Sequence, residues 1–458
     1  MATSAVASSS AGTLDVPSLV SQLMTVERQP IDKLNIKVAS FETKLSSFGT
    51  LKGMASSFQT ALQTLTTSLG QNSATASDSS ILSATASSSA AAGVYSLNVG
   101  TLAKTHQLAA AGQVSDTTAI STGASTVTFN VGATTTNVSI AAGATLQDIR
   151  TAINAANVGV TATIINDGSG TPFRLALSSN ASGTSNAVNS ITVQTGGDAA
   201  VNDLLAYNPT ANAPAPAIPM TQNVAAQDAS FTLNGITITS ASNTVTTAIQ
   251  GVTLNLSKVG TSDLTVATDT GAIKTAVAGF VDSYNALYSQ LKSRSAYGSA
   301  TKAAPDLAGD GTVRSMMEQM RGIMGTPASG GIMTMMSQAG ISFQSDGSLK
   351  VDSAKLDAAM ASSMSDVTNL FTSSTGFITR LNTWSDSVVQ TGGLIDQRVS
   401  AINTSITGVN DQISKLENRM TALQKSYTKL YSDLNLALSS MNSTSAYLAQ
   451  QFSKSSGG

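Results

Sequence analysis

The chain has 458 residues, of which 11% are charged and 4% aromatic, and its formal net charge is −2. That length is enough for about three domains of ordinary size. Because the chain lacks a basic excess, we expect no nucleic-acid partner. It has no cysteine and one histidine, His106, which leaves little for thiol, zinc or acid–base chemistry near neutral pH. We therefore expect no enzyme, no cofactor and no bound metal.

The first twelve residues are small and mostly polar, so they cannot bury enough apolar surface to offset the entropy of being ordered. We expect a mobile tail there. The first thirty residues lack a basic head followed by an apolar run, and no stretch of 18 or more apolar residues occurs elsewhere. We expect neither a Sec-type signal nor membrane insertion.

The apolar positions from Leu34 onward are spaced by four and three residues, which predicts one long helix that reaches Leu69. The period is interrupted near Lys52 and Gly53, where a kink is possible in such a helix. The pattern predicts a helical segment that buries one face against another helix.

Between about Ser73 and Asp269 the pattern changes to alternation rich in Thr, Val and Ile, which predicts a β region. Residues 145–155 interrupt it with helical spacing, and Thr145 is the expected N-cap. Residues 166–170 read as a hairpin turn and not as a calcium loop, because the preceding positions lack the acidic ligands. Four prolines within residues 209–219 indicate an extended crossing between two β units.

Helical periodicity returns after Gly271, in residues 272–295, 312–324 and 353–371 and in a long run from Leu394. That last run carries an unbroken heptad seam, with steps of four and three. Its members are Ile395, Val399, Ile402, Ile406, Val409, Ile413, Leu416, Met420, Leu423, Tyr427, Leu430 and Leu434.

Burial of this seam at about 2 kcal/mol per side chain contributes roughly 24 kcal/mol. Ordering some forty residues costs on the order of 40 to 80 kcal/mol before hydrogen bonds are counted, so the helix needs partners. The heptads of residues 34–69 are the intramolecular candidate, and this pairing would bring both chain ends together. The positions flanking the seam are mostly uncharged, which predicts weak electrostatic selectivity.

Three further features have an ordinary structural interpretation. His106 lies at the end of a predicted strand without a second histidine, so a surface or strand-end structural role is favoured. Asp306 and Asp310 lie in a loop with Gly and Pro, where turn and capping roles outweigh acid catalysis. A methionine cluster is interpreted as adaptable core, with a contact to another subunit or to a partner protein as the alternative. The cluster comprises Met316, Met317, Met320, Met324, Met333, Met335 and Met336.

Several stretches resemble a known family. Residues 14–31 (LDVPSLVSQLMTVERQPI) are similar to the opening signature of the bacterial flagellar filament cap family, hook-associated protein 2 or FliD. Residues 145–157 (TLQDIRTAINAAN) with the strands that follow to residue 178 resemble the helix-plus-hairpin motif of flagellins and hook-associated proteins. Residues 233–256 and 340–371 resemble the family's second β segment and C-terminal region.

The resemblance implies an α+β multidomain fold, in which terminal helical coiled-coil or bundle legs flank an inserted pair of β-rich head domains. It implies a ring-shaped, pentamer-like homo-oligomer at the distal filament tip, outside the cell. The implied partners are flagellin, the hook–filament junction proteins, the flagellar type III export apparatus and an export chaperone. An extracellular adhesin that uses the β-rich head domains is the alternative function.

The implied organisation runs through seven segments. They are an N-terminal leg (1–40), the first part of a helical bundle (41–72), the first part of an inner β domain (73–110), an outer β head domain (111–220), the second part of the inner β domain (221–270), the second part of the bundle (271–390) and a C-terminal coiled-coil leg (391–458). On the legs we expect filament or oligomer contacts at Leu14, Val16, Leu19, Val20, Leu23, Met24, Leu34, Val38, Tyr427, Leu430, Leu434, Leu438, Met441, Leu448 and Phe452.

Overall fold

The computed structural model describes residues 14–209, 220–296 and 304–455. The tail expected over residues 1–12 and most of the proline-containing crossing lie outside the described residues. The chain divides into two compact units: a helical unit, formed by residues up to 69 and from 270 onward, and a β unit, residues 70–269. Helices that flank an inserted β region confirm the predicted α+β multidomain class.

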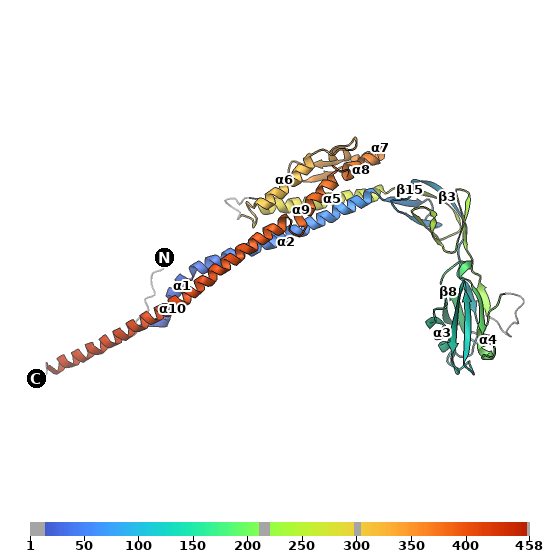
Figure 1. Ribbon diagram of the computed structural model, residues 1–458, viewed down its shortest axis with the longest axis horizontal. Helices are drawn as coiled ribbons and strands as arrows, with labels where there is room; N and C mark the ends of the chain where they lie inside the picture. Colours follow the sequence, from blue (N-terminus) through green and yellow to red (C-terminus); the bar gives the residue numbers. More distant parts are fainter. Residues whose placement is uncertain (1–13, 210–219, 297–303, 456–458) are drawn as a thin grey trace. The chain divides into compact units, whose positions relative to one another are not determined.

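The helical unit is built on two long helices, α2 and α10, and is drawn in Figure 1. Its helices are α1 (Val16–Glu27), α2 (Gln29–Leu69), α5 (Thr270–Ser295), α6 (Gly311–Gly325), α7 (Ser353–Ser362), α8 (Met364–Thr372), α9 (Phe377–Val389) and α10 (Leu394–Ser455). The helix predicted from Leu34 is confirmed and continues without a break through Gly53. Leu51 and Ala55, both fully buried, fill the apolar face where the heptad spacing is interrupted.

The core of the helical unit centres on Phe58 of α2. Its ring lies 5.9 Å from that of Phe280 and 6.1 Å from those of Tyr284 and Trp384, measured between centroids. The last two contacts are edge-on, the geometry that aromatic quadrupoles favour. α2 therefore packs between α5, which carries Phe280 and Tyr284, and α9, which carries Trp384. The methionine cluster contributes to this core, because Met316, Met320, Met324 and Met336 are buried and Met317 and Met333 pack against it.

The helical pattern after Gly271 is more interrupted than expected. The segment predicted over residues 353–371 is two helices, because Ser363 is extended (φ −160°, ψ 94°) and its hydroxyl accepts from the Asp366 N–H at 3.3 Å. A β-hairpin of β16 (Ile341–Phe343) and β17 (Leu349–Val351) was not expected. It begins after Gly340, whose φ is +79° and where a Cβ would lie 2.6 Å from the Asp352 carbonyl oxygen. Only glycine fits that position.

Helix α9 was also missed from the pattern. It buries Phe377, Leu381, Trp384 and Val388 along one face, at helical spacing. The preceding Gly376 starts the helix without a side-chain cap, which removes the usual start signal. The helix lies between α8 and α10 in the chain and completes the core of the helical unit.

The β unit has an inner and an outer subdomain, each with its own core. The inner subdomain contains a five-stranded sheet of order β1-β15-β3-β11-β12 and a three-stranded sheet of order β13-β14-β2, all antiparallel. The strands are β1 (Asn72–Ala76), β2 (Leu82–Ala86), β3 (Gly93–Thr101), β11 (Ala229–Leu233), β12 (Ile236–Ser240), β13 (Thr244–Ile249), β14 (Val252–Leu256) and β15 (Gly260–Thr268). Phe231, Leu254 and Leu264 are among its buried side chains.

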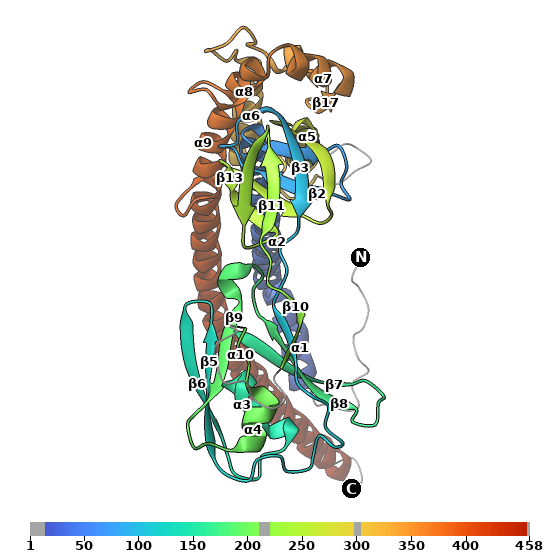
Figure 2. The same ribbon diagram turned by 90° about the vertical axis from the view of Figure 1, so that its right-hand side faces the viewer.

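The outer subdomain packs two helices with sheets of order β10-β4-β8-β7 and β6-β5-β9, labelled in Figure 2. Its elements are β4 (Gln107–Ala109), β5 (Ser125–Val131), β6 (Thr134–Ile140), α3 (Leu146–Ala155), β7 (Val160–Asn166), β8 (Phe173–Ser179), β9 (Val188–Val193), α4 (Ala199–Leu205) and β10 (Thr221–Val224). The four-stranded sheet of the outer subdomain includes β4 and β10, which the seven-segment division assigns to the inner β domain. The remaining limits of that division stay a prediction.

The helix predicted over residues 145–155 is confirmed, with Thr145 and Asp148 forming a capping box. The Asp148 N–H donates to the Thr145 hydroxyl at 3.2 Å, and the Thr145 N–H donates to the Asp148 carboxylate at 3.0 Å. The predicted hairpin turn is also confirmed, since it joins β7 to β8. A second helix, α4, was not expected; Asp198 caps it.

Asparagine side chains extend two of the small sheets. The Asn154 side-chain N–H donates to the Ala162 carbonyl oxygen at 2.9 Å, and the Ala162 N–H donates to Asn154 Oδ1 at 2.7 Å. Ala162 lies on β7, an outer strand of its sheet. Asn285 of α5 pairs with both main-chain groups of Leu349 on β17 in the same way, at 2.9 and 2.7 Å. Each amide takes the place that a neighbouring strand residue would occupy.

Candidate functional site

The N-terminal helix α1 packs against the middle of α10, and the two run side by side in Figure 1. Asp15 caps α1 by accepting the Ser18 N–H, and Pro17 stands in the first turn, where no N–H is required. Val16, Val20 and Met24 follow at steps of four, so they share one face. That face is buried against Met420 and the partly buried Ile413, Leu416, Leu423, Tyr427 and Tyr431 of α10, with Ile31 and Leu14 completing the cluster.

A groove of about 530 Å³ follows the contact between α1 and α10. Its floor is apolar, from Val16, Val20 and Met24, and its rim is polar. The rim and remaining lining residues are Pro17, Ser21, Thr25, Arg28, Gln424, Thr428 and Ser432. Just before α1, the Leu14 N–H donates to Asn435 Oδ1 at 3.0 Å, and this bond fixes the start of α1 on α10.

The seam of α10 is only partly covered. Ile395, Ile402, Val409 and Met420 are buried, and six other members are half-buried. Ile395, Val399, Ile402 and Ile406 pack with α2 in the core of the helical unit. Lys52 of α2 also forms an ion pair with Asp396 of α10. Leu430 and Leu434 are 59% and 44% exposed. The intramolecular candidate expected from the sequence, the helix of residues 34–69, therefore covers the first part of the seam, α1 covers the middle, and the C-terminal end, where α10 runs past Leu14, is exposed.

We call the apolar face of α10 beyond Leu430 the terminal stripe. It comprises Leu434, Leu438, Met441, Leu448 and Phe452. Leu434, Met441 and Leu448 continue the heptad spacing of the buried seam, and Leu438 and Phe452 lie one position off that spacing. Met441, Leu448 and Phe452 are 64%, 49% and 71% exposed. Residues 434–453 contain no charged side chain. The terminal stripe is thus an exposed, uncharged apolar face on a helix whose earlier part uses the same face for packing.

The leg residues predicted from the sequence fall into two groups. The first is turned toward the chain itself: Val16, Val20 and Met24 are buried, and Leu14, Leu19, Leu23, Leu34, Val38, Tyr427 and Leu438 are half-buried. The second group is exposed and comprises Leu430, Leu434, Met441, Leu448 and Phe452. The structure brings Leu14, Val16, Val20, Met24 and Tyr427 together in one cluster around α1 and leaves the second group on α10 as a surface. Filament or oligomer contacts at these residues stay a prediction.

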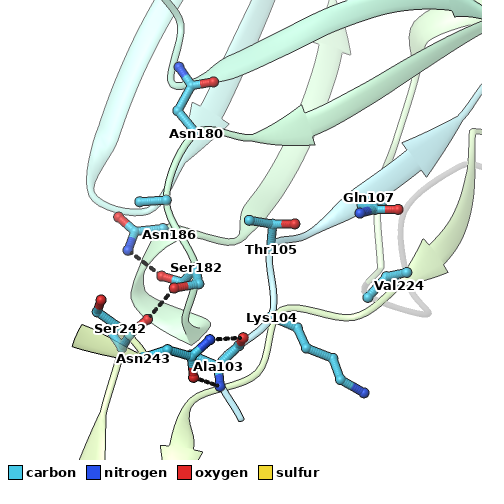
Figure 3. Close-up of a pocket in the computed structure, with 12 residues that line it drawn as sticks. Ala103, Lys104, Thr105, Gln107, Asn180, Ser182, Asn186, Val224, Ser242 and Asn243 are labelled. Atoms are coloured by element: carbon cyan, nitrogen blue, oxygen red, sulfur yellow. Dashed lines mark hydrogen bonds between the residues drawn. The ribbon is translucent and has the colours of Figure 1, made fainter. Parts of the chain in front are cut away.

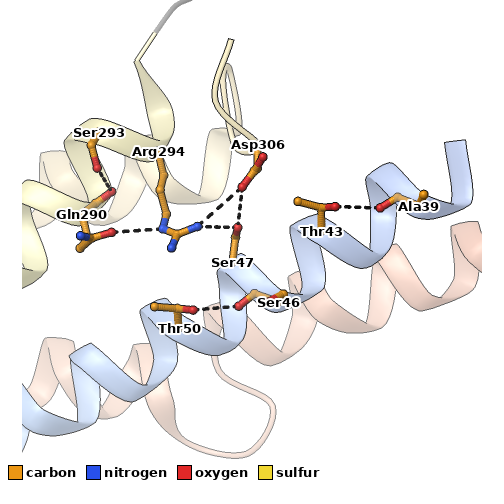
Figure 4. A network of polar contacts seen from close by, with 9 residues as sticks. All are labelled: Ala39, Thr43, Ser46, Ser47, Thr50, Gln290, Ser293, Arg294 and Asp306. Atoms are coloured by element: carbon orange, nitrogen blue, oxygen red, sulfur yellow. Dashed lines mark hydrogen bonds and ion pairs between the residues drawn. The ribbon is translucent and has the colours of Figure 1, made fainter. Parts of the chain in front are cut away.

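A polar network that the sequence did not reveal joins α2 to α5 (Figure 4). Arg294 donates to the Ser47 hydroxyl at 2.6 Å, and that hydroxyl donates to the Asp306 carboxylate at 3.1 Å. Arg294 also lies 3.7 Å from the Asp306 carboxylate. The capping role predicted for Asp310 is confirmed, since its carboxylate accepts the Thr312 N–H at the start of α6. The same carboxylate pairs with Arg398 of α10 at 2.8 Å.

Within the β unit, a cavity of about 790 Å³ lies where the inner and outer subdomains meet (Figure 3). Its lining is mostly amide and hydroxyl side chains, with Lys104 as the charged member. Asn243 pairs with both main-chain groups of Ala103, at 2.7 and 3.0 Å, and Ser182 donates to the Ala241 carbonyl at 2.7 Å. The bond from Ser182 to Ala241 joins the outer subdomain to the inner one, and the Asn243 pairing lies within the inner subdomain.

Nothing in the described part of the chain forms a cluster of three or more His, Cys, Asp or Glu side chains that could hold a metal ion. In the same residues, no helix combines the length and apolar character needed to cross a membrane. Most of the acidic side chains described above either cap a helix or form a salt bridge. The surface of the described residues presents helix faces and polar side chains, and both can bind another macromolecule.

The comparisons with known families agree with this architecture. The family description "Flagellar hook-associated protein 2 N-terminus" matches residues 12–106, and "Flagellar hook-associated protein 2 C-terminus" matches residues 226–443. "Flagellin hook IN motif" matches residues 126–181, which span β5 to β8 of the outer subdomain. Together these matches define a structural protein of the bacterial flagellum.

Individual relatives narrow the class. Flagellar hook-associated protein 2 of Escherichia coli K12 is 32% identical over 97% of each chain. The A-type flagellar hook-associated protein 2 of Pseudomonas aeruginosa is 30% identical, over 96% of this chain and 95% of that one. The crystal structure of the flagellar cap protein FliD D1-D2-D3 domains from Escherichia coli matches with a TM-score of 0.66 and 34% identity, over 78% of this chain and 99% of that one. The chain belongs to the flagellar hook-associated protein 2 family, a family of structural cap proteins.

Proposed function

We propose that this protein caps the distal tip of the flagellar filament, where it retains exported flagellin and promotes its folding and insertion. The terminal stripe carries the proposal at the level of residues. It is an exposed helix face, and it is continuous with a seam that the chain already uses for helix packing. Such a face fits recognition by helices of a neighbouring subunit, through anchors at heptad spacing.

The strength expected of such a contact suits repeated release and rebinding. Fully burying one Leu, Met or Phe side chain contributes about 1.5 to 3 kcal/mol, and association entropy offsets much of the sum from five such side chains. The uncharged surroundings add little electrostatic selectivity or steering. Each leg would therefore bind modestly. Several legs on one ring would keep a released leg at high effective concentration, so the cap would stay attached.

The family membership supports the remaining partners as part of the same proposal. We assign the protein to a ring-shaped, pentamer-like homo-oligomer that contacts flagellin and the hook–filament junction proteins. Export would use the flagellar type III apparatus, with a chaperone for the unassembled chain. A chain without cysteine needs no thiol oxidation after export, which is consistent with this route.

The family assignment favours capping over the adhesin alternative. Residues 73–269, which an adhesin would use, contain nine aspartates and four basic residues. An acidic surface does not attract sulfated or sialylated glycans through charge. We therefore do not extend the proposal to adhesion.

The experiment replaces Met441 and Leu448 with glutamate in the full chain, in a strain that lacks any other copy of the gene. Charges on the terminal stripe should prevent its burial, so flagellin should appear in the medium as monomer and filaments should be short or absent. Ser443→Glu, on the opposite side of the same exposed helix, is the matched control and should leave filaments normal. Circular dichroism of the purified variants checks the fold. Normal filaments from the folded double variant would refute the role of the terminal stripe.

A further inference from the structure

His106, the single histidine of the chain, lies at the root of the outer β subdomain and not on the surface. Only 3% of the residue is exposed. Its Nδ1 accepts the main-chain N–H of Val188 at 2.9 Å, at the start of β9. Its Nε2 lies 3.1 Å from Oε1 of Gln222 on β10, and the Tyr207 hydroxyl donates to the same oxygen at 2.9 Å.

These contacts fix the protonation state of the ring. An imidazole nitrogen that accepts an N–H carries no hydrogen, so Nδ1 is bare. Nε2 faces an amide oxygen, which only accepts, so the hydrogen of the neutral ring is on Nε2. A second proton would have to bind at Nδ1, where it would meet the Val188 N–H. The closed arrangement is therefore compatible with neutral imidazole and incompatible with imidazolium.

The surroundings provide no charge that would compensate a protonated ring. Strands β4, β9 and β10 carry no charged residue, and Arg174, on β8, is paired with Asp167. The Asp228 carboxylate accepts the N–H and hydroxyl of Thr184, at 2.7 and 2.8 Å. Lys104, just before β4, is exposed.

Two more titratable groups belong to the elements around the ring. Asp203 of α4, which packs on β9, is half-exposed, and no contact between its carboxylate and the ring is seen among the described residues. Tyr207 packs edge-on against His106 at 5.6 Å between ring centroids, and burial raises the pKa of its phenol, so it stays neutral. The ring is thus surrounded by neutral groups.

The position of the ring gives its protonation a structural consequence. The described chain enters the outer subdomain through β4, directly after His106, and leaves it through β10, which carries Gln222. These two strands pair with each other over a few residues only. The His106 ring adds hydrogen bonds from the segment just before β4 to both β9 and β10. Protonation at Nδ1 affects the bond to Val188, at the start of β9, whereas β4 and β10 stay joined through the Nε2–H bond to Gln222 and the two main-chain bonds between Lys104 and Gln227.

We propose that His106 is an acid-sensitive latch on the outer β subdomain: protonation at Nδ1 breaks the bond to the Val188 N–H and opens the start of β9 away from the segment that enters the subdomain. Because the open form binds the proton and the closed form does not, acidification favours opening. Histidine is the side chain whose charge ordinarily changes in the range from pH 5 to 8.

The test compares the full chain at pH 7.5 and pH 5.0 by hydrogen exchange with mass spectrometry, with protection factors corrected for intrinsic rates. Peptides that cover residues 186–193 should lose protection at pH 5.0 by tenfold or more, while peptides of α2 and α5 should not change. His106→Asn is the matched variant, because asparagine Oδ1 can accept the Val188 N–H without titrating. It should abolish the pH dependence of these peptides.

The single histidine provides a second, independent readout. Nitrogen chemical shifts of 15N-histidine in the full chain should show the hydrogen on Nε2 at pH 7.5, and imidazolium should appear together with the loss of protection. An imidazolium signal with full protection of residues 186–193 at pH 5.0 would overturn the proposal. Equal pH dependence in wild type and His106→Asn would also overturn it. If the variant does not fold, the wild-type comparison of protonation with protection decides alone.

Discussion

The main-chain N–H of Leu14 donates to the side-chain Oδ1 of Asn435 at 3.0 Å, across 421 positions of sequence. This bond and the packing of Met24 near Met420 show that α1 runs antiparallel to α10. The start of α1 therefore marks the point on α10 where intramolecular cover ends and the terminal stripe begins.

Replacement of Asn435 with alanine should loosen the start of α1. The bond to the Leu14 N–H contributes about 0.5 to 1.5 kcal/mol, which corresponds to a factor of about 2 to 10 in the opening of α1. Hydrogen exchange of a peptide that covers residues 14–27 measures this opening directly. Asn442→Ala, an exposed position on the same helix, is the control and should leave the exchange of α1 unchanged. Equal effects of the two substitutions would show that the Asn435 bond does not hold α1.

Replacement of Phe58 with alanine should remove the centre of the core of the helical unit. The ring is fully buried among Phe280, Tyr284 and Trp384, so the substitution should lower the free energy of unfolding by about 3 to 5 kcal/mol. Trp384 is the single tryptophan of the chain and is buried in this core, so its fluorescence in urea follows the transition. Phe343→Ala, at a 42% exposed ring, should change the free energy of unfolding by about 0.5 kcal/mol. A comparable loss from both variants would contradict the assignment of Phe58 to the centre of the core.

Replacement of Tyr284 with phenylalanine should stabilise the helical unit or leave it unchanged. Its side chain is fully buried, and its hydroxyl has no hydrogen-bond partner among the residues that the structure describes. Burial also raises the pKa of this phenol far above its ordinary value. Removing an unpaired buried hydroxyl should raise the free energy of unfolding by about 1 kcal/mol, as measured by Trp384 fluorescence in urea.

Tyr207→Phe is the contrasting substitution, because that hydroxyl donates to Gln222 Oε1. It should lower the protection of the outer subdomain against hydrogen exchange by about fivefold, equivalent to about 1 kcal/mol. A clear loss of stability from Tyr284→Phe would mean that its hydroxyl has a partner in solution.

Asp198 should make the stability of the outer subdomain depend on pH. Hydrogen bonds from the Thr122 hydroxyl at 2.6 Å and the Gly123 N–H at 2.7 Å hold the pKa of this carboxyl below its ordinary value. A lowered pKa in the folded state stabilises the fold above the ordinary carboxyl range, and this stabilisation is lost from about pH 5 downward.

The substitution Asp198→Asn should therefore destabilise the outer subdomain at pH 7 and make a smaller difference at pH 3, where the carboxyl of the unfolded chain is already largely protonated. Hydrogen exchange of peptides from β5 and α4 at the two pH values measures the change. Asp203→Asn, on the same helix α4, is the control and should show a small effect at both. A destabilisation by Asp198→Asn that is as large at pH 3 as at pH 7 would contradict the role of the carboxylate charge.

The sequence patterns predicted those elements whose signal is local. The capping box of Thr145 and Asp148 depends on residues three apart, and the helix from Leu34 depends on a repeat that no tertiary contact interrupts. Both were predicted correctly. Ser363 was not, because a serine within a helical pattern becomes a break only when the flanking helices pack in different directions. The β16–β17 hairpin is only a few residues long and depends on Asn285 of another helix.

The site shows the same division between local and distant information. The heptad spacing identified which face of α10 is apolar, but it could not show how much of that face α1 and α2 cover. The extent of cover depends on where Leu14 meets Asn435, a contact between distant parts of the chain. His106 is a similar case: a polar residue before a short strand has no local signal for burial, and its partners Val188, Tyr207 and Gln222 come from three other segments.

The pairing of Asn154 with Ala162 has a consequence for a protein that assembles beside many other chains. An outer strand with free N–H and C=O groups is a template to which foreign strands add, and this is a common route to aggregation. At Ala162 both groups of β7 are occupied by an amide from the chain's own α3. A passing segment of extended polypeptide cannot pair with β7 at this point without displacing that side chain. The asparagine thus protects the edge of the sheet while leaving the helical faces free to associate.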